Sequence, residues 1–265
     1  MKTSNHLLRR LTAALLAAVL ALSIALPVFA SDDGDTIYIN SVSDLLSLAK
    51  SCAYDQWSVG KTVILQKDLS LEGMLWEPIP SFSGQFKGNG HTISDLTITG
   101  QYSPAGLFGI VEEQGSIESL SVRGIVSVSD SADTTTGGIV GINHGTLINC
   151  QFTGVVTGDS EVGGIVGRNE SEGTIDHSTA RAIVTGKSST GGIAGYNLGA
   201  ITGCTNVGSI NTEYQEASLD TDGFTAKMVD QINNKIAAAD DDATNSVTNV
   251  ATDTGGIAGR SSGMI

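Results

Sequence analysis

The sequence is poor in cysteine and in aromatic residues. Its three cysteines are Cys52, Cys150 and Cys204, and an odd, sparse set of this kind does not make a disulfide framework. Aromatic residues make up 5% of the chain, whereas glycines number 33, which excludes an ordinary globular core. Valine, isoleucine and leucine nevertheless recur regularly, so the composition also excludes a disordered chain.

A long apolar run occurs only once, at the start of the chain. Three basic residues precede an apolar stretch over 11–25, Pro27 breaks the run, and Val28 and Ala30 stand at the −3 and −1 positions of a cleavage site. This layout is typical of a secretory signal peptide over 1–30, cleaved after Ala30. The stretch is short for a membrane span, and no second one follows. We therefore expect a secreted or cell-surface protein without a membrane span after signal cleavage.

Basic residues are scarce as well. Without residues 1–30 the chain has 11 Lys and Arg against 28 Asp and Glu, a net charge of −17. An acidic surface repels nucleic acid and anionic lipid, which disfavours partners bound through phosphates and predicts no nucleic acid partner. Cations and basic protein segments stay compatible with this charge, and so does a simple role in solubility.

What the chain does contain is a glycine-rich repeat. The pattern GGIxG starts at residues 137, 163, 191 and 255, with a degenerate copy over 105–109, so that full copies start 26, 28 and 64 residues apart. A spacing near 26 is about one turn of a β-helix. The structural glycines of the repeat are Gly137, Gly138, Gly141, Gly163, Gly164, Gly167, Gly191, Gly192, Gly195, Gly255, Gly256 and Gly259.

Each copy continues in the same way, so that equivalent residues form columns. A turn glycine is followed by an aliphatic two positions later, by small or apolar residues five and seven positions later, and then by a β-branched pair. The columns are Ile117, Leu147, Ile175 and Ile201; Leu120, Cys150, Ser178 and Cys204; Val122, Phe152, Ala180 and Asn206; and the pairs 125–126, 155–156, 183–184 and 209–210.

Short β-branched segments bounded by glycine predict strands. One rung cannot bury its own apolar face, but rungs stacked about 4.8 Å apart pair every interior strand on both edges. We therefore predict an all-β chain, folded as a right-handed parallel β-helix. Glycines at its corners are expected to supply positive φ. Asn143, Asn169 and Asn197 are expected at one left-handed turn position, where they would stack as an amide ladder.

The cysteine column has a further consequence. Ser178 separates Cys150 from Cys204, so the two cysteines are two rungs, or about 9.6 Å, apart. A disulfide requires Cα atoms closer than about 7 Å. Cys150 and Cys204 are therefore predicted to be buried free thiols.

The regular repeats over 101–212 have predicted additions on both sides. Residues 31–100 are expected to hold an N-terminal cap and the first strands. The cap is a helix from Ser41 to Ala53 that covers the open end of the coil. Ser41 is its predicted N-cap, and its expected apolar face is Val42, Leu45, Leu46 and Ala49.

An acidic insertion over 213–252 interrupts the repeats, and a further, incomplete repeat follows over 253–265. The insertion contains a predicted helix over 224–239 whose apolar stripe consists of Phe224, Met228, Val229, Ile232 and Ile236. Insertions in solenoids often form the binding face, and the alternative is a helix that packs back on the coil. Because the chain stops inside a rung, we expect the sequence to be a fragment of a longer surface protein.

No motif assigns a catalytic, cofactor-binding or metal site. The zinc-protease and nucleophile-elbow patterns do not occur, and Gly186-Lys187-Ser188 lacks the first glycine and the helix of a phosphate loop. The densest charged region consists of Arg168, Glu170, Glu172, Asp176, His177 and Arg181. Parallel β-helices can carry polysaccharide-cleaving carboxylates on an outer face, but a solvated face of mixed charge is the simpler interpretation.

Calcium is the one metal ion that the composition brings into consideration, and no cofactor is predicted. Acidic clusters that could bind it occur at 32–35, at Asp220 and Asp222, and at 240–242. None of them has the spacing of an EF-hand loop. Calcium binding by one of these clusters therefore stays an open alternative.

The repeat resembles the GLUG-motif family through 137–150, 163–178, 191–204 and the broken copy over 255–265. Proteins of this kind are large surface or secreted bacterial proteins. They include non-catalytic regions of proteins like IgA1 proteases and adhesin-like proteins. The resemblance thus implies a β-helical stalk or binding module.

Three functional hypotheses follow. The first is a cell-surface stalk or adhesin-like module, not an enzyme, that binds a protein or a glycan. The second is the N-terminal non-catalytic region of a larger exported peptidase or polysaccharide-active enzyme. The third is a polysaccharide lyase that depends on Asp176 and Arg181.

Overall fold

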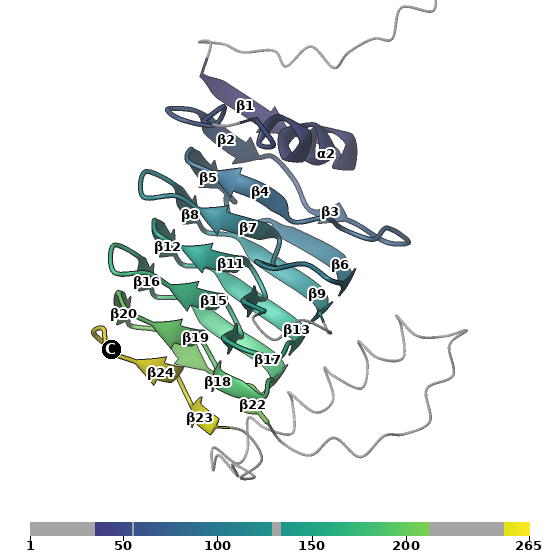
Figure 1. The fold of residues 1–265 in the computed structure, drawn as a ribbon. Coiled ribbons are helices and arrows are strands. Elements are labelled where there is room, and N and C mark those ends of the chain that lie inside the picture. Colours follow the sequence, from purple (N-terminus) through teal and green to yellow (C-terminus); the bar gives the residue numbers. More distant parts are fainter. Residues whose placement is uncertain (1–34, 55, 129–133, 212–251) are drawn as a thin grey trace, which may run out of the picture. The chain divides into compact units, whose positions relative to one another are not determined.

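The computed structural model of the chain describes residues 35–54, 56–128, 134–211 and 252–265. Over these residues the chain forms a parallel β-solenoid of about six turns, which confirms the predicted fold class (Figure 1). The predicted signal peptide over 1–30 lies outside the described residues, as does the predicted helix over 224–239.

A full turn runs through four short strands on four sides of the coil. One such turn consists of β11 (Val140–Asn143), β12 (Thr146–Ile148), β13 (Gln151–Thr157) and β14 (Val162–Gly163). Each of these strands pairs in parallel with its equivalent in the neighbouring turns. Because every interior strand has a partner on each edge, its backbone groups are paired without a hairpin.

The strands accordingly form four sheets, named A to D here. Sheet A contains β1 (Thr36–Ile39), β2 (Thr62–Leu65), β5 (Gln85–Lys87), β8 (Ser116–Glu118), β12, β16 (Thr174–Asp176) and β20 (Ala200–Thr202). Sheet B contains β3 (Leu69–Ser70), β6 (Thr92–Gly100), β9 (Ser121–Val128), β13, β17 (Thr179–Thr185) and β21 (Thr205–Asn206), and β22 (Ser209–Ile210) also pairs with β17. Sheet C contains β4 (Ile79–Phe82), β7 (Phe108–Val111), β11, β15 (Val166–Asn169), β19 (Ala194–Asn197) and β24 (Ala258–Ser261). Sheet D contains β10 (Thr136–Gly137), β14, β18 (Ser188–Gly191) and β23 (Thr252–Gly255).

The register of the sheets reproduces the columns of the repeat. Leu147 pairs with Ile117 and Ile175, and Phe152 pairs with Val122 and Ala180. The last copy joins the same register across the 64-residue gap, since Gly255 pairs with Gly191 and Ala258 with Ala194. The insertion therefore leaves the stacking of the rungs intact.

In the β-branched pairs 155–156 and 183–184 only one member is fully buried, whereas Ile125 and Val126 are both buried. Along β13 and β17, buried and partly exposed residues alternate, as they must where successive side chains point to opposite faces of a strand. Val126, Val156 and Val184 are fully buried, whereas Val155 and Ile183 lie on the outer face. The columns of the sequence did not show that Val155 and Val156, or Ile183 and Val184, face opposite sides of their strands.

The repeat glycines serve a different purpose from the one expected. None of the GGIxG glycines has a positive φ; they are needed because there is no room for a side chain. A Cβ on Gly137 would meet the Val140 carbonyl oxygen, and a Cβ on Gly164 would meet the Gly192 carbonyl oxygen one rung away. Close stacking of backbone, rather than a left-handed corner, selects glycine at these positions.

A left-handed corner does exist, and other residues occupy it. It lies between sheets A and B, where Ser119, Asn149 and His177 have φ between 46° and 53° and Gly203 has φ of 61°. Asparagine and histidine tolerate this conformation better than most side chains. The sequence did not reveal this column because its four members share no residue type.

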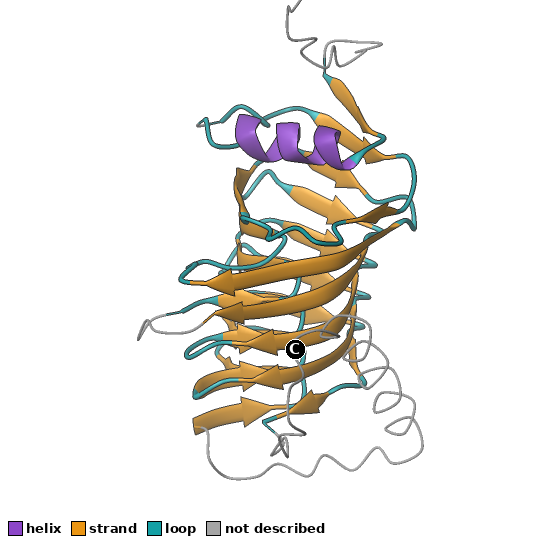
Figure 2. Cartoon of the chain, turned by 90° about the vertical axis from the view of Figure 1, so that its right-hand side faces the viewer, coloured by secondary structure: helices purple, strands orange, loops and turns teal. Residues whose placement is uncertain are grey.

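The helix α2 (Val42–Ser51) lies at the N-terminal end of the coil (Figures 1 and 2). It begins as predicted, because the Ser41 hydroxyl accepts a hydrogen bond from the Asp44 backbone N–H at 3.2 Å. Its buried residues are Leu45 and Leu48. The expected face was thus partly wrong, since Val42, Leu46 and Ala49 are only half-buried.

Candidate functional site

Polar groups occur both inside the coil and on its outer faces, and the interior set is a ladder of amides. Asn143, Asn169 and Asn197 pair in register at the ends of three sheet C strands and are fully buried. The Nδ2 group of Asn143 donates to Asn169 Oδ1 at 2.7 Å, and that of Asn169 donates to Asn197 Oδ1 at 2.8 Å. The predicted amide ladder is confirmed.

The ladder stands on strands, however, and not at left-handed turns as expected. Each asparagine also binds its own turn: Asn143 Nδ2 donates to the Gly145 carbonyl at 3.1 Å, and Asn143 Oδ1 accepts from the Gly145 N–H at 3.2 Å. A buried amide with all of its groups paired stabilises the turn and offers nothing to a ligand. The ladder is therefore structural.

The cysteine column is also part of the interior. The Cys150 backbone N–H donates to Ser178 Oγ at 3.1 Å, and the Ser178 N–H donates to Cys204 Sγ at 3.4 Å, so the predicted order holds. All three cysteines of the chain are free thiols. Cys150 is buried as expected, but Cys204 is only half-buried, because no described strand of the next rung covers it.

These thiols are poor nucleophiles. Burial raises the pKa of Cys150 and of Cys52 to about 12, and burial also raises the pKa of Cys204. A thiol with a raised pKa is almost entirely protonated at neutral pH, and the thiolate is the reactive form.

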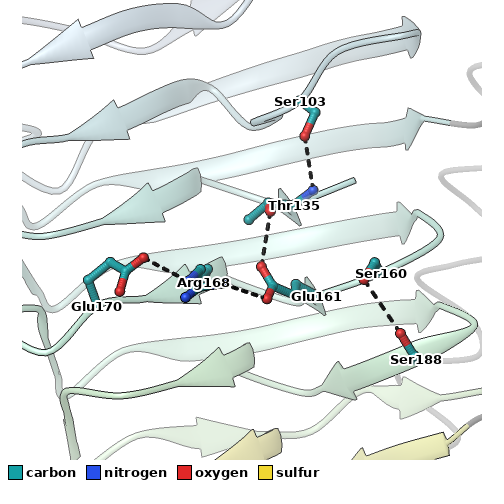
Figure 3. Close-up of polar contacts among 7 residues, drawn as sticks. All are labelled: Ser103, Thr135, Ser160, Glu161, Arg168, Glu170 and Ser188. Carbon is teal, nitrogen blue, oxygen red and sulfur yellow. Dashed lines mark hydrogen bonds and ion pairs between the residues drawn. The ribbon is translucent and has the colours of Figure 1, made fainter. Parts of the chain in front are cut away.

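The outer surface carries one polar network that crosses several rungs (Figure 3). Arg168 on β15 forms ion pairs with Glu161 at 2.9 Å and with Glu170 at 2.7 Å. Glu161 also accepts a hydrogen bond from the Thr135 hydroxyl at 3.0 Å, and the Thr135 N–H donates to Ser103 Oγ at 3.3 Å. The network therefore connects three successive turns of the coil.

The charged groups of this network are paired with one another, one guanidinium between two carboxylates. Partial burial acts to lower the pKa of Arg168, but Glu161 and Glu170 outweigh it and hold that pKa above its usual value. Arg168 Nη1 and Nε each contact a carboxylate oxygen, so two of the guanidinium nitrogens are engaged within the network. The geometry indicates a polar brace between rungs.

Next to the brace, two arginines stack on one tyrosine. Arg168, Tyr196 and Arg260 pair in register on β15, β19 and β24. The guanidinium carbons lie 5.0 Å and 5.5 Å from the centroid of the Tyr196 ring, within the range of a cation–π interaction. Arg260 is exposed and forms no ion pair with a described residue.

The other members of the predicted charged region do not join this network. Asp176 lies on sheet A, where its Oδ1 atom is 2.8 Å from Nδ1 of His177, and His177 fills the left-handed corner. Arg181 lies on β17 in sheet B. The sequence placed these residues together because they are close along the chain, but the coil distributes them over different sides.

A hollow that sequence reasoning missed lies near the N-terminal end of sheet C. It has a volume of about 370 Å³, and its polar lining includes Gln56, Ser81, Glu112, Glu113, Gln114 and His144. The Ser81 hydroxyl donates to Glu112 Oε1 at 2.8 Å. The available signal was the turn over 112–114, whose equivalent one copy later begins near His144.

Neither a metal centre nor a membrane helix was found in the part of the chain that the structure describes. No group of three or more His, Cys, Asp and Glu side chains is arranged to hold a metal ion there. The acidic clusters at Asp220, Asp222 and 240–242 lie outside the described residues. No helix among the described residues is long and apolar enough to cross a membrane.

Comparison with known proteins identifies the repeat. Residues 158–185 match the model of the GLUG motif. In the structure these residues cover one turn of the coil, including β14, β15, β16 and β17. The chain therefore carries a GLUG repeat, as its sequence predicted.

Two curated relatives share longer stretches. The chain is 32% identical over 155 residues to Halomucin of Haloquadratum walsbyi, a match that covers 54% of this chain and 2% of Halomucin. It is 29% identical over 137 residues to a protein of Evansella cellulosilytica named as a Gly-rich membrane protein, covering 37% of this chain and 16% of that protein. The chain thus spans a small share of the length of both relatives.

Among solved structures, the chain is similar to a Bacteroides ovatus protein named as an immunoglobulin A1 protease. The match has a TM-score of 0.40 and 15% sequence identity, and it covers 72% of this chain and 82% of the other.

Proposed function

We propose that the chain is an exported repeat protein that acts at the cell surface or in the medium as a stalk or adhesin-like interaction module. Its partner is a protein or a glycan, and the chain itself is not an enzyme. Its similarity to Halomucin and to a protein named as a Gly-rich membrane protein supports a place at the cell surface. The apolar stretch over 11–25 supports export.

The observation that carries this proposal is the contrast between the two faces of sheet C. Its inner face repeats over the later rungs, where Asn143, Asn169 and Asn197 form the amide ladder. Its outer face varies along the coil, and apart from the successive Ile110 and Ile142 each rung presents a different side chain in the column Ser81, Ile110, Ile142, Arg168, Tyr196 and Arg260. A rigid repeat that presents varied side chains along one line suits an extended ligand, which contacts several rungs at once.

The same surface supports the absence of catalysis in this chain. The most concentrated charges are paired with one another in the Arg168 brace. Among the described residues, the thiols have raised pKa values. Asp176 and Arg181, which a lyase would require together, stand on different sheets.

A binding assay tests the proposal. The secreted chain would be applied to glycan arrays and to intact cells, together with the double variant Tyr196→Ala and Arg260→Ala. We expect the targets that bind the unaltered chain to bind the double variant at least tenfold more weakly. Thr146→Ala with Thr174→Ala, two outward positions on sheet A, is the matched control and should bind normally. Depolymerase or peptidase activity in the purified chain, or equal binding by the variant, would contradict the proposal.

A second candidate is the non-catalytic region of a larger exported peptidase or polysaccharide-active enzyme. The observation that favours it is that both matched relatives are much longer than the matched part. Sequencing the coding region beyond the Ile265 codon tests it. An in-frame zinc-protease motif or glycosidase domain supports the candidate, and further repeats ending in an anchor motif exclude it.

A further inference from the structure

The hollow near the N-terminal end of sheet C is formed by segments that lie far apart in the sequence. Three successive turns of the coil contribute to it, from β4, β7 and β11 or from the corners that follow these strands. Since the three strands are neighbours in sheet C, the hollow extends about 10 Å along the coil. The segment between α2 and β2 supplies the rest of the lining with Gln56 and Val59. Only the folded coil brings these groups together.

Backbone hydrogen bonds hold the walls of the hollow in place. The Glu112 N–H donates to the Phe82 carbonyl at 2.9 Å, and the His144 N–H donates to a carbonyl of β7 at 2.8 Å, so each corner is fixed to the one before it. The Ser83 N–H donates to Ser58 Oγ at 2.8 Å, which ties the segment after α2 to the first corner. A site whose walls are fixed before a ligand arrives loses less conformational entropy on binding.

The lining of the hollow combines hydrogen-bond acceptors with donors. The carboxylates of Glu112 and Glu113 accept, whereas the amides of Gln56 and Gln114 both accept and donate. His144 brings an imidazole, which in its neutral form adds one donor and one acceptor. A sugar hydroxyl likewise donates and accepts, so the lining matches a ligand with several hydroxyl groups. A cationic group only donates and would leave the amide donors without partners.

The size and the charge of the hollow narrow the ligand further. Its volume of about 370 Å³ lies at the lower end of the roughly 300–1,000 Å³ of small-molecule sites, which suits one sugar ring. Among the described residues that line it there is no Lys or Arg, so Glu112 and Glu113 repel a ligand carboxylate or sulfate. Val59, whose exposed fraction is 42%, offers an apolar contact for the C–H groups of the ring. An uncharged sugar fits these features best.

We propose that this hollow binds one uncharged sugar residue of a glycan. The sugar hydroxyls donate to the carboxylates of Glu112 and Glu113 and accept from the amide of Gln114. The proposal rests on the proposed interaction role, to which it adds a ligand class and a second site. The hollow lies at the β4 end of sheet C, whereas Tyr196 and Arg260 lie on β19 and β24 at the other end. The two sites can therefore be altered independently.

Nuclear magnetic resonance titration of the full secreted chain tests the proposal. The probes are glucose, galactose, mannose and N-acetylglucosamine, each with its matching acidic sugar where one exists. We expect at least one uncharged sugar to shift the backbone amide signals of 112–114 and His144 saturably, with a Kd on the order of 10 mM, because one small polar ligand makes few contacts. The matching uronate should bind at least tenfold more weakly, since its carboxylate meets Glu112 and Glu113.

A variant of the lining and a matched control locate the binding. Glu113→Ala with Gln114→Ala, two exposed positions, should weaken sugar binding at least tenfold and leave the remaining spectrum unchanged. The control Gln66→Ala with Glu72→Ala removes the same two side-chain types at exposed positions outside the hollow and should bind normally. Equal binding by the lining variant, or by the uronate, overturns the proposal.

Two further outcomes overturn it and identify what failed. Shifts at the hollow with Nα-acetylarginine amide but with none of the sugars assign the site to a basic protein segment. No shift with any sugar at concentrations up to about 100 mM, in a chain that still binds cells through Tyr196 and Arg260, removes this site and leaves the proposed function standing. Conversely, sugar shifts at the hollow in a chain whose cell binding ignores Tyr196 and Arg260 support the hollow and contradict the other site.

Discussion

The first and the later turns of the solenoid fill one interior column with different chemistry. The column begins with Phe82 and Val111 on β4 and β7 and continues as Asn143, Asn169 and Asn197. The N-terminal end is an apolar core, in which the ring centroids of Phe82 and Phe86 each lie 5.4 Å from that of Phe108. The later rungs depend on hydrogen bonds between stacked amides.

The comparison shows that rungs stack equally well on apolar side chains or on amides in the same interior column, provided that the side chains of adjacent rungs complement one another. Aromatic rings stabilise the first turns through the apolar area that they bury, so this stabilisation depends on the volume and shape of the side chains. Amides stabilise the later turns through directional bonds, and each Nδ2 group donates to an acceptor one rung away, which is an amide for Asn143 and Asn169 and the Ser261 hydroxyl for Asn197. The two ends should therefore respond differently to the same kind of substitution.

Removing a ring from the apolar end should have the largest effect. Phe108 is fully buried, so Phe108→Ala leaves a cavity and is expected to cost about 3–5 kcal/mol. Urea unfolding followed by tryptophan fluorescence measures it, since Trp76 donates from Nε1 to the Leu107 carbonyl at 3.1 Å and reports on this end. Phe108→Leu should cost less than about 1.5 kcal/mol. A cost below about 1 kcal/mol for the alanine variant would show that this end is not held by its rings.

In the amide end, a substitution that conserves volume should still be costly. Asn169→Leu removes the acceptor that Asn143 Nδ2 uses besides the Gly145 carbonyl, and it removes the donor to Asn197 Oδ1. We expect a loss of about 2–4 kcal/mol. Chemical denaturation measures the loss, and hydrogen exchange should localise it to β15 and β19. The matched change Val111→Leu, in the apolar part of the same column, should cost less than about 1.5 kcal/mol. Equal costs for the two leucine variants would contradict the comparison.

Replacing a glycine of the rungs by asparagine should lower the stability of the fold more than the same replacement of a glycine in a turn. Gly164→Asn places a Cβ against the Gly192 carbonyl and the Ala180 side chain and should cost about 1–3 kcal/mol. Gly73 has φ of 74°, and a Cβ added there would have no atom within 4 Å; asparagine also tolerates such a φ. Gly73→Asn should therefore cost less than about 1 kcal/mol. Thermal unfolding of both variants measures the two losses of stability. A larger loss for Gly73→Asn than for Gly164→Asn would contradict the steric role of the rung glycines.

The buried thiols should make the fold sensitive to alkali. Because burial raises the pKa of Cys150 from about 9 to about 12, the thiol stays protonated in the folded chain while it ionises in the unfolded one. Its contribution is fully present below pH 9 and is lost as pH rises towards 12, at about 1 kcal/mol per pH unit. Cys150→Ala should show a shallower fall in stability between about pH 8 and pH 10.5. Identical slopes in the two chains would be the contrary result.

The polar brace of Arg168, Glu161 and Glu170 should contribute least to the free energy of unfolding. Arg168 and its two carboxylates are partly exposed, so Arg168→Met is expected to cost only about 0.5–1 kcal/mol, and less in high salt. Unfolding at low and at high salt measures the effect, with Arg181→Met, which lacks an ion pair with a described residue, as the control. A loss above about 2 kcal/mol that salt does not reduce would indicate a packing role for the Arg168 side chain.

Much of the fold could be predicted because a solenoid repeats its own sequence. Equal spacing placed Leu147 over Ile117, Cys150 beside Ser178, and the asparagines in one ladder, and the register confirms each of them. What periodicity could not supply was the direction of each side chain. The face of α2, the outward position of Val155 and the left-handed corner at Asn149 depend on how the backbone turns between strands.

The candidate surfaces were less predictable than the core for the same reason. Arg168, Asp176 and Arg181 are neighbours in the sequence, but a four-sided coil turns a corner every few residues and sends them to sheets C, A and B. Conversely, Arg168, Tyr196 and Arg260 are far apart in the sequence and stack directly. The partners of an outer side chain are set by the next rung and not by the next residue.

The sequence by itself determined the repeat, its period and the columns that stack, because burial of one rung by the next imposes the same residue types at the same spacing. The tertiary structure alone decided why the glycines are there, where the left-handed corner lies and which charges pair. These depend on the few ångströms between adjacent rungs, where a Cβ collides or a guanidinium meets a carboxylate. Such distances arise only once the coil has closed.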